Sequence, residues 1–152
     1  MTKTHRFLRI GSATRRAILL TLALSPIAAS THEYYGLDFT LIHPWGDATP
    51  DDQLASAPIY FSMENVRSKD RLVRASTRYA ETVEFRSSDA ADAKVLKAID
   101  ISPADKLDFG KDGPHMVLRN LKVPLQWGRS YEMTMVFEKS GAMQVMVSVG
   151  AH

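Results

Sequence analysis

The stretch SYEMTMVFEKSGAMQVMVSV, residues 130–149, alternates apolar and polar side chains and then reverses direction at Lys139-Ser140-Gly141. Successive side chains of a β-strand point to opposite faces, so this alternation predicts a β-hairpin with one buried face. The apolar face consists of odd-numbered residues: Tyr131, Met133, Met135, Phe137, Val145, Val147 and Val149. A chain with this unit must fold as at least part of a sheet.

Strand-like runs also occupy most of the remaining chain, at residues 37–45, 57–66, 71–88 and 115–121. The stretch 71–88 divides into two runs around Tyr79-Ala80. Only residues 89–99, DAADAKVLKAI, look helical, and that run is brief. Many short strands separated by turn residues predict an all-β fold, a Greek-key β-sandwich or barrel. The predicted core combines the apolar hairpin face with six further residues: Leu41, Ile59, Phe61, Leu72, Val83 and Leu118.

The first thirty residues have the layout of a secretory signal peptide: a basic start up to Arg16, an apolar stretch and a small-residue end, Ala28-Ala29-Ser30. The apolar stretch meets Ser25-Pro26 after about eight residues, too few for the ~20 of a membrane span. We therefore expect a signal peptide at residues 1–30 and a mature β domain at residues 31–152, with no membrane span. The pair Arg15-Arg16 leaves the Sec and twin-arginine routes both open, and either leads to the periplasm.

The leader also carries the excess positive charge of the chain. Residues 31–152 hold 14 basic and 17 acidic residues, a formal charge of −3, which gives no support to nucleic-acid binding. The chain has no cysteine, so only histidine, methionine and carboxylates remain as side-chain metal ligands. No sequence motif of an enzyme is present, and we expect a protein that is not an enzyme.

An ordered series of segments resembles the periplasmic copper chaperones called PCu(A)C, a cupredoxin-like family. The series begins with IHPWGDATP and APIYFSMEN and continues with DRLVRASTRYAETVEF. It ends with the most specific segment, GPHMVLRNLKVPLQWGRSYEMTMVFEKSGAMQVMVSV. The resemblance spans roughly residues 37–150. It implies a cupredoxin-like β domain that binds copper and passes it to a periplasmic or membrane protein.

The copper site of that family uses a histidine or methionine at the end of a strand reading like VELHEM, then a methionine about ten residues on, then His-x-Met. Carried over, the resemblance puts Phe85, Leu96 and Val117 at three of these positions and leaves His115 as the one surviving ligand. The implied motif is therefore degenerate and the implied copper site weakened. We expect the His115 ring to point toward open space at one rim of the barrel.

The candidate metal ligands are His115, Met116 and Met63. Thioethers suit Cu(I), and imidazole holds either oxidation state of copper. Strand alternation argues that Met116 faces away from His115, toward the core, unless a bulge redirects it. Met63 is also interpreted as core packing first. Near the mature amino terminus, His32 offers a further imidazole for copper.

A second reading remains open, in which the chain keeps the chaperone fold without the metal and binds another protein. In that case Phe85, Leu96 and Val117 form an apolar patch around the former site. Three further features are interpreted as structural or solvated: His43, held extended by Pro44, and the acidic pairs Asp51-Asp52 and Asp89/Asp92.

Overall fold

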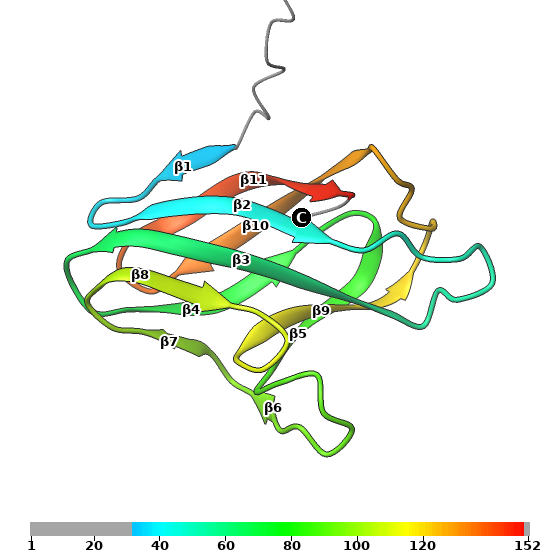
Figure 1. The fold of residues 1–152 in the computed structure, drawn as a ribbon, viewed down its shortest axis with the longest axis horizontal. Helices are drawn as coiled ribbons and strands as arrows, with labels where there is room; N and C mark the ends of the chain where they lie inside the picture. The colour runs from blue at the N-terminus through cyan, green and yellow to red at the C-terminus, as the bar shows by residue number, and fades with distance from the viewer. Residues whose placement is uncertain (1–31, 151–152) are drawn as a thin grey trace, which may run out of the picture.

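The computed structural model describes residues 32–150, and all regular structure in that range is β (Figure 1). The predicted all-β class is confirmed. No helix within residues 32–150 has the length and apolar character needed to cross a membrane. The strands are β1 Glu33–Tyr35, β2 Thr40–Gly46, β3 Ser56–Val66, β4 Asp70–Ser76, β5 Ala80–Arg86, β6 Val95–Leu96, β7 Ile99–Ile101, β8 Ala104–Phe109, β9 His115–Leu121, β10 Ser130–Phe137 and β11 Gly141–Val149.

The strands join into a sheet that curls back toward itself. Its hydrogen-bonded order is β6-β5-β9-β3-β2-β11-β10-β4-β7, with β1 added beside β2 and β8 beside β3. The first and last strands of this order, β6 and β7, are consecutive in the chain, and only Lys97 and Ala98 separate them. So short a link brings the two ends of the sheet together, which gives the barrel-like shape in Figure 1.

The long strand β3 connects the two halves of this barrel. Its first residues, Ser56 to Ile59, pair with β9, and its later residues, Phe61 to Val66, pair with β8. Along its other edge, β3 pairs with β2. A single strand therefore belongs to both halves, and the start of β9 is held at the point where the neighbour of β3 changes.

The predicted hairpin and core are confirmed. β10 and β11 pair from Ser130↔Ser148 to Phe137↔Gly141, and all seven residues of the predicted apolar face are buried. Of the six further core residues, five are buried, and Val83 packs half-buried against them. The predicted boundary at Tyr79-Ala80 separates β4 from β5.

Two local predictions are wrong. Residues 89–99 form turns, β6 and the start of β7 in place of a helix, since one or two turns of helix are costly to nucleate and Ser87 and Ser88 hydrogen-bond the backbone instead. His43 is not extended: its φ is +44°, at a bulge where two residues of β2 lie between the pairs Ile42↔Ser62 and Trp45↔Tyr60. The predicted signal peptide lies outside the described residues.

Candidate metal centre

His115 is the first residue of β9, and its side chain lies on the face of the sheet opposite the main core. Its cross-strand partner on β5 is Arg86, and its ring packs against Tyr60 of β3 with the ring centroids 5.3 Å apart. Tyr60 in turn packs against Trp45 of β2 at 4.7 Å. The three rings form a row across neighbouring strands, and the row fixes the plane of the imidazole.

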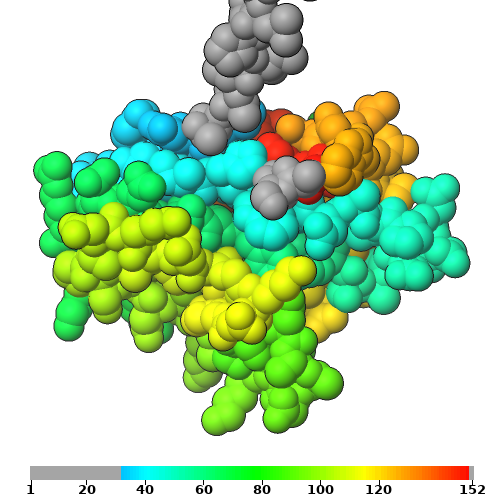
Figure 2. All heavy atoms as spheres, in the orientation of Figure 1, coloured from blue at the N-terminus to red at the C-terminus, as the bar shows by residue number. Residues whose placement is uncertain are grey.

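The His115 ring is fully buried, with an exposed fraction of 0%. The expectation that it points toward open space is therefore wrong. The segment between β5 and β6 lies over the ring and contributes Asp89 to its surroundings. Asp89 N donates to Lys111 O at 2.8 Å, and this hydrogen bond ties the segment to the loop before β9. In Figure 2 the region around β6 projects from the body of the molecule.

The two nitrogens of His115 have different surroundings. Nδ1 lies 2.8 Å from the carbonyl oxygen of Gly113 and must be the donor, because a carbonyl only accepts. Nε2 lies 2.8 Å from Oδ1 of Asp89, yet it has no aligned hydrogen-bond partner. Oδ1 is therefore close to Nε2 but off the direction of a ring N–H bond, and the contact is electrostatic.

Tyr60 orients the carboxylate of Asp89. Its hydroxyl donates to Oδ2 of Asp89 at 2.5 Å, while Oδ1 faces the imidazole. Burial, this hydrogen bond and the negative charges of Asp89 and Asp47 raise the pKa of Tyr60 well above its ordinary value. Tyr60 thus stays a neutral donor that positions Asp89, and it does not offer a phenolate.

A surface cavity of about 190 Å³ adjoins the cluster of His115, Asp89 and Tyr60. Arg86, Ser88, Arg119 and Val117 contribute to its walls together with His115 and Asp89. The side chain of Asp89 is 36% exposed, whereas His115 is sealed, so solvent reaches the cluster from the Asp89 side. The Arg119 Nε atom is already engaged with Glu84 at 2.8 Å.

The structure does not bring the three predicted ligands together. Met116 is fully buried on the opposite face of β9 from His115, paired with Ile59 and Phe85. Met63 is buried four residues beyond Ile59 on β3, which is about 13 Å along a strand. Metal bonds are ~2.0–2.3 Å long, so Met63 and Met116 do not share one ion with His115 in this arrangement.

The register also corrects the carried-over positions. Phe85 and Leu96 are cross-strand partners on the core side, whereas Val117 lies on the His115 side opposite Glu84 and Pro58. The residue across from His115 is Arg86. Matching VELHEM to VEFRSS letter by letter likewise puts Arg86, and not Phe85, at the histidine position. The expected patch of Phe85, Leu96 and Val117 is thus divided between two faces.

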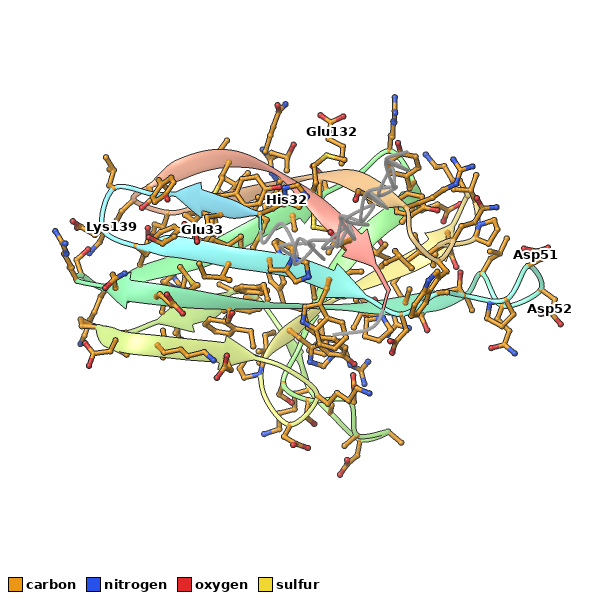
Figure 3. The ribbon with its side chains drawn as sticks, turned by 45° about the horizontal axis from the view of Figure 1, so that its top comes forward. His32, Glu33, Asp51, Asp52, Glu132 and Lys139 are labelled. Atoms are coloured by element: carbon orange, nitrogen blue, oxygen red, sulfur yellow. The ribbon has the colours of Figure 1, made fainter. Side chains whose placement is uncertain are left out.

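Sequence reasoning missed Asp89, Tyr60 and Arg86. Asp89 was expected to be solvated, and no spacing in the sequence signals its contact with a histidine 26 residues later. A signal did exist for Arg86 and Tyr60, since alternation along β5 and β3 fixes which residues share a face with His115. Asp92 fits the expectation, as do Asp51 and Asp52, which point outward at the tip of the β2–β3 loop in Figure 3.

The donor set decides which form of copper these residues fit. Imidazole and carboxylate are suitable donors for divalent copper, and the thioethers that favour Cu(I) lie inside the core. The buried Nε2 without an aligned partner is the feature that fits a bound cation. Within residues 32–150, no cluster of three or more His, Asp or Glu side chains able to hold a metal is found. The described residues therefore fit a copper site only in part, through one imidazole and one carboxylate.

Comparisons with known proteins give a matching family and several similar solved structures. The family described as "Putative lipoprotein LpqE-like" matches residues 39–149, and no curated protein matches the chain. A copper-bound PCuAC domain from PmoF2 is 27% identical, with a TM-score of 0.67, over 80% of this chain and 99% of that one. An apo PCuAC domain from PmoF1 is 27% identical, with a TM-score of 0.69, over 80% of this chain and 100% of that one.

A third solved structure extends the likeness in fold alone. The solution structure of Cu(I)-bound DR1885 from Deinococcus radiodurans is 20% identical, with a TM-score of 0.60, and the match covers 78% of this chain and 80% of that one. Together the three structures confirm the expected PCuAC-type, cupredoxin-like fold.

Proposed function

The chain belongs to the LpqE-like family, and from that premise we propose that it is an exported protein that binds copper weakly and delivers it to a periplasmic or membrane partner. The family description names a lipoprotein, which supports export, as does the leader-like start of the sequence. The copper-bound PCuAC domain at 27% identity supports the choice of metal.

The state of His115 is the observation that carries this proposal. Its Nδ1–H is anchored on a backbone carbonyl, and its Nε2 faces a carboxylate without an aligned hydrogen bond. Histidines that hold metals in proteins have this same outer contact, which fixes the tautomer and aims the other nitrogen at the ion. A carrier needs a site that releases its cargo, and an incomplete ligand set suits release.

The alternative, a metal-free module that binds protein through an apolar patch, has less support. Phe85 is buried and Leu96 packs against the core, whereas Val117 lies on the other face of the sheet. These side chains therefore do not form one continuous surface for a partner.

Competition titrations test the proposal. The purified protein is titrated with Cu(I) and with Cu(II) against chelators of known affinity, and His115→Gln is compared with His32→Ala. Gln at position 115 keeps polar contacts but is a poor copper ligand, so we expect at least a tenfold loss of copper affinity. His32→Ala is the matched control, because His32 is an exposed imidazole on another part of the chain (Figure 3).

Two outcomes would contradict the proposal. Copper affinity that falls in His32→Ala and not in His115→Gln would move the site to the amino terminus. If the wild type binds no copper although its circular-dichroism spectrum shows a folded protein, the proposed copper-binding function is wrong.

A further inference from the structure

We infer that Nε2 of His115 and a carboxylate oxygen of Asp89 are adjacent ligands of one divalent-cation site, which takes Cu(II) in preference to Cu(I). This inference rests on the proposed function and deepens it by naming a second ligand and an oxidation state. It also replaces the expected methionine ligands with an oxygen donor from the segment that covers His115.

The contact between the two atoms suits a bound cation. Nδ1 is the donor to Gly113, so Nε2 is the ring nitrogen that faces Oδ1 of Asp89, 2.8 Å away. A carboxylate oxygen this close to a ring nitrogen favours a positive charge beside it. Because Oδ1 is not aligned with a ring N–H bond, a proton on Nε2 satisfies the contact poorly.

The distance fits two neighbouring ligands of a square-planar ion. Metal bonds of ~2.0 Å at a right angle end on atoms about 2.8 Å apart. The measured separation of Nε2 and Oδ1 is 2.8 Å. Cu(II) favours this tetragonal arrangement of nitrogen and oxygen donors, whereas Cu(I) favours sulfur donors.

The adjoining cavity gives the ion a path to Asp89 and holds the water molecules that complete its ligand set. Asp89 is 36% exposed and lines this cavity of about 190 Å³, which has room for several water molecules. Tyr60 holds Oδ2, so Oδ1 stays turned toward His115. Two protein ligands completed by water make a site that exchanges its ion readily.

Arg86 limits the affinity of this site. It is the cross-strand partner of His115, and paired residues place their Cβ atoms about 5 Å apart on one face. A guanidinium is always protonated, so it repels a bound cation. We expect Arg86→Gln to raise Cu(II) affinity by about threefold to tenfold.

The deciding experiment compares Asp89→Asn with Asp92→Asn, a matched change of an exposed carboxylate on the same segment. Cu(II) and Cu(I) affinities are measured by chelator competition on the full protein, and thermal melts followed by circular dichroism verify folding. We expect Asp89→Asn to lose at least tenfold in Cu(II) affinity, with Asp92→Asn unchanged. Electron paramagnetic resonance of the Cu(II) protein should show a tetragonal spectrum with coupling to one imidazole, altered in Asp89→Asn.

The outcomes separate this inference from the proposed function. Cu(II) binding that depends on His115 and is equal in both Asn variants would overturn the role of Asp89 and leave copper binding intact. Tighter binding of Cu(I) than of Cu(II) would overturn the preference alone. If neither ion binds the folded wild type, both proposals fail.

Discussion

The buried carboxylate of Asp70 shows how one residue can organise a turn distant in sequence. Its oxygens accept hydrogen bonds from Lys139 N at 2.9 Å, Ser140 N at 3.0 Å and Ser140 Oγ at 2.8 Å, and also from Arg71 N at 2.7 Å. Burial by itself would raise the pKa of Asp70, but these donors outweigh it and hold the pKa below its ordinary value. Folding therefore favours the ionised carboxylate.

Asp70 should make the stability of the protein depend on pH at the acidic end. A pKa that is lower in the folded state adds stability above pH about 3.9, the ordinary value for Asp, and this stability is lost as the pH falls through the folded value. Asp70→Asn should cost about 1–3 kcal/mol at pH 7 because three backbone donors lose a charged acceptor. Urea unfolding at pH 7 and pH 3 measures the difference.

The difference in unfolding free energy between wild type and Asp70→Asn should narrow at pH 3, because this pH lies below the ordinary pKa of Asp and the carboxylate of the unfolded chain is then largely protonated. Asp51→Asn, an exposed carboxylate in the β2–β3 loop, is the control and should stay within about 0.5 kcal/mol of wild type. If Asp70→Asn and Asp51→Asn lose the same unfolding free energy at pH 7, the role given to Asp70 is contradicted.

Residue by residue, the sequence predicted half of the candidate site. His115 was found because it was the one position matching the family's ligands, and alternation placed Met116 on the other face, where the structure has it. Burial of His115 was missed because it depends on the segment from Ser87 to Lys94, which has no periodicity. Asp89 was missed for the same reason.

At the scale of single elements, the β10–β11 hairpin was predicted almost residue for residue. Two faces of opposite polarity fix its register, since a slip by one residue would expose every buried side chain. The turn itself depends on Gly141, whose φ of +79° is strained for any residue with a Cβ.

Replacing Gly141 with Ala should measure this backbone strain in isolation. A Cβ at Gly141 meets no atom within 4 Å, and the same holds for Gly110, whose φ is not in the left-handed region. We expect Gly141→Ala to lower the unfolding free energy by about 1–2 kcal/mol, with a smaller change in Gly110→Ala. Denaturant unfolding of both variants provides the comparison, and equal losses would refute a strain mechanism.

The segment that sequence patterns misread, residues 89–99, shows where element-level prediction stops. Its alanines and lysines have good helix propensity, but the run is too short to form a helix without tertiary support. Pairing of Val95 and Leu96 with β5 and of Ile99 to Ile101 with β4 decided its conformation instead.

At the scale of the whole molecule, pairing of distant segments should make unfolding a single event. β11 pairs in parallel with β2, through Ser148↔Trp45 and Val149↔Gly46, so both ends of the domain are needed to complete the sheet. β3 pairs within both halves. We expect coincident denaturation curves from far-ultraviolet circular dichroism and tryptophan fluorescence. Separated transitions would show that the halves fold independently.

The strand order could not be predicted from the sequence. Sequence patterns predicted the strands and a Greek-key class, and these were confirmed. Alternation of apolar and polar residues does not indicate which strands become neighbours in the sheet. The placement of β11 beside β2 and of β8 and β9 along one edge of β3 follows from how the buried faces fit in three dimensions.

The way the curled sheet ends has a consequence for behaviour at high concentration. A long, unpaired strand edge can pair with a strand of another chain and so seed fibrils. Here the terminal strands β6 and β7 span only two and three residues, and β8 presents the charged side chains of Asp105, Lys106 and Asp108. Short or charged edges offer little template for strand addition, so fibril seeding through these strands is disfavoured even at high concentration.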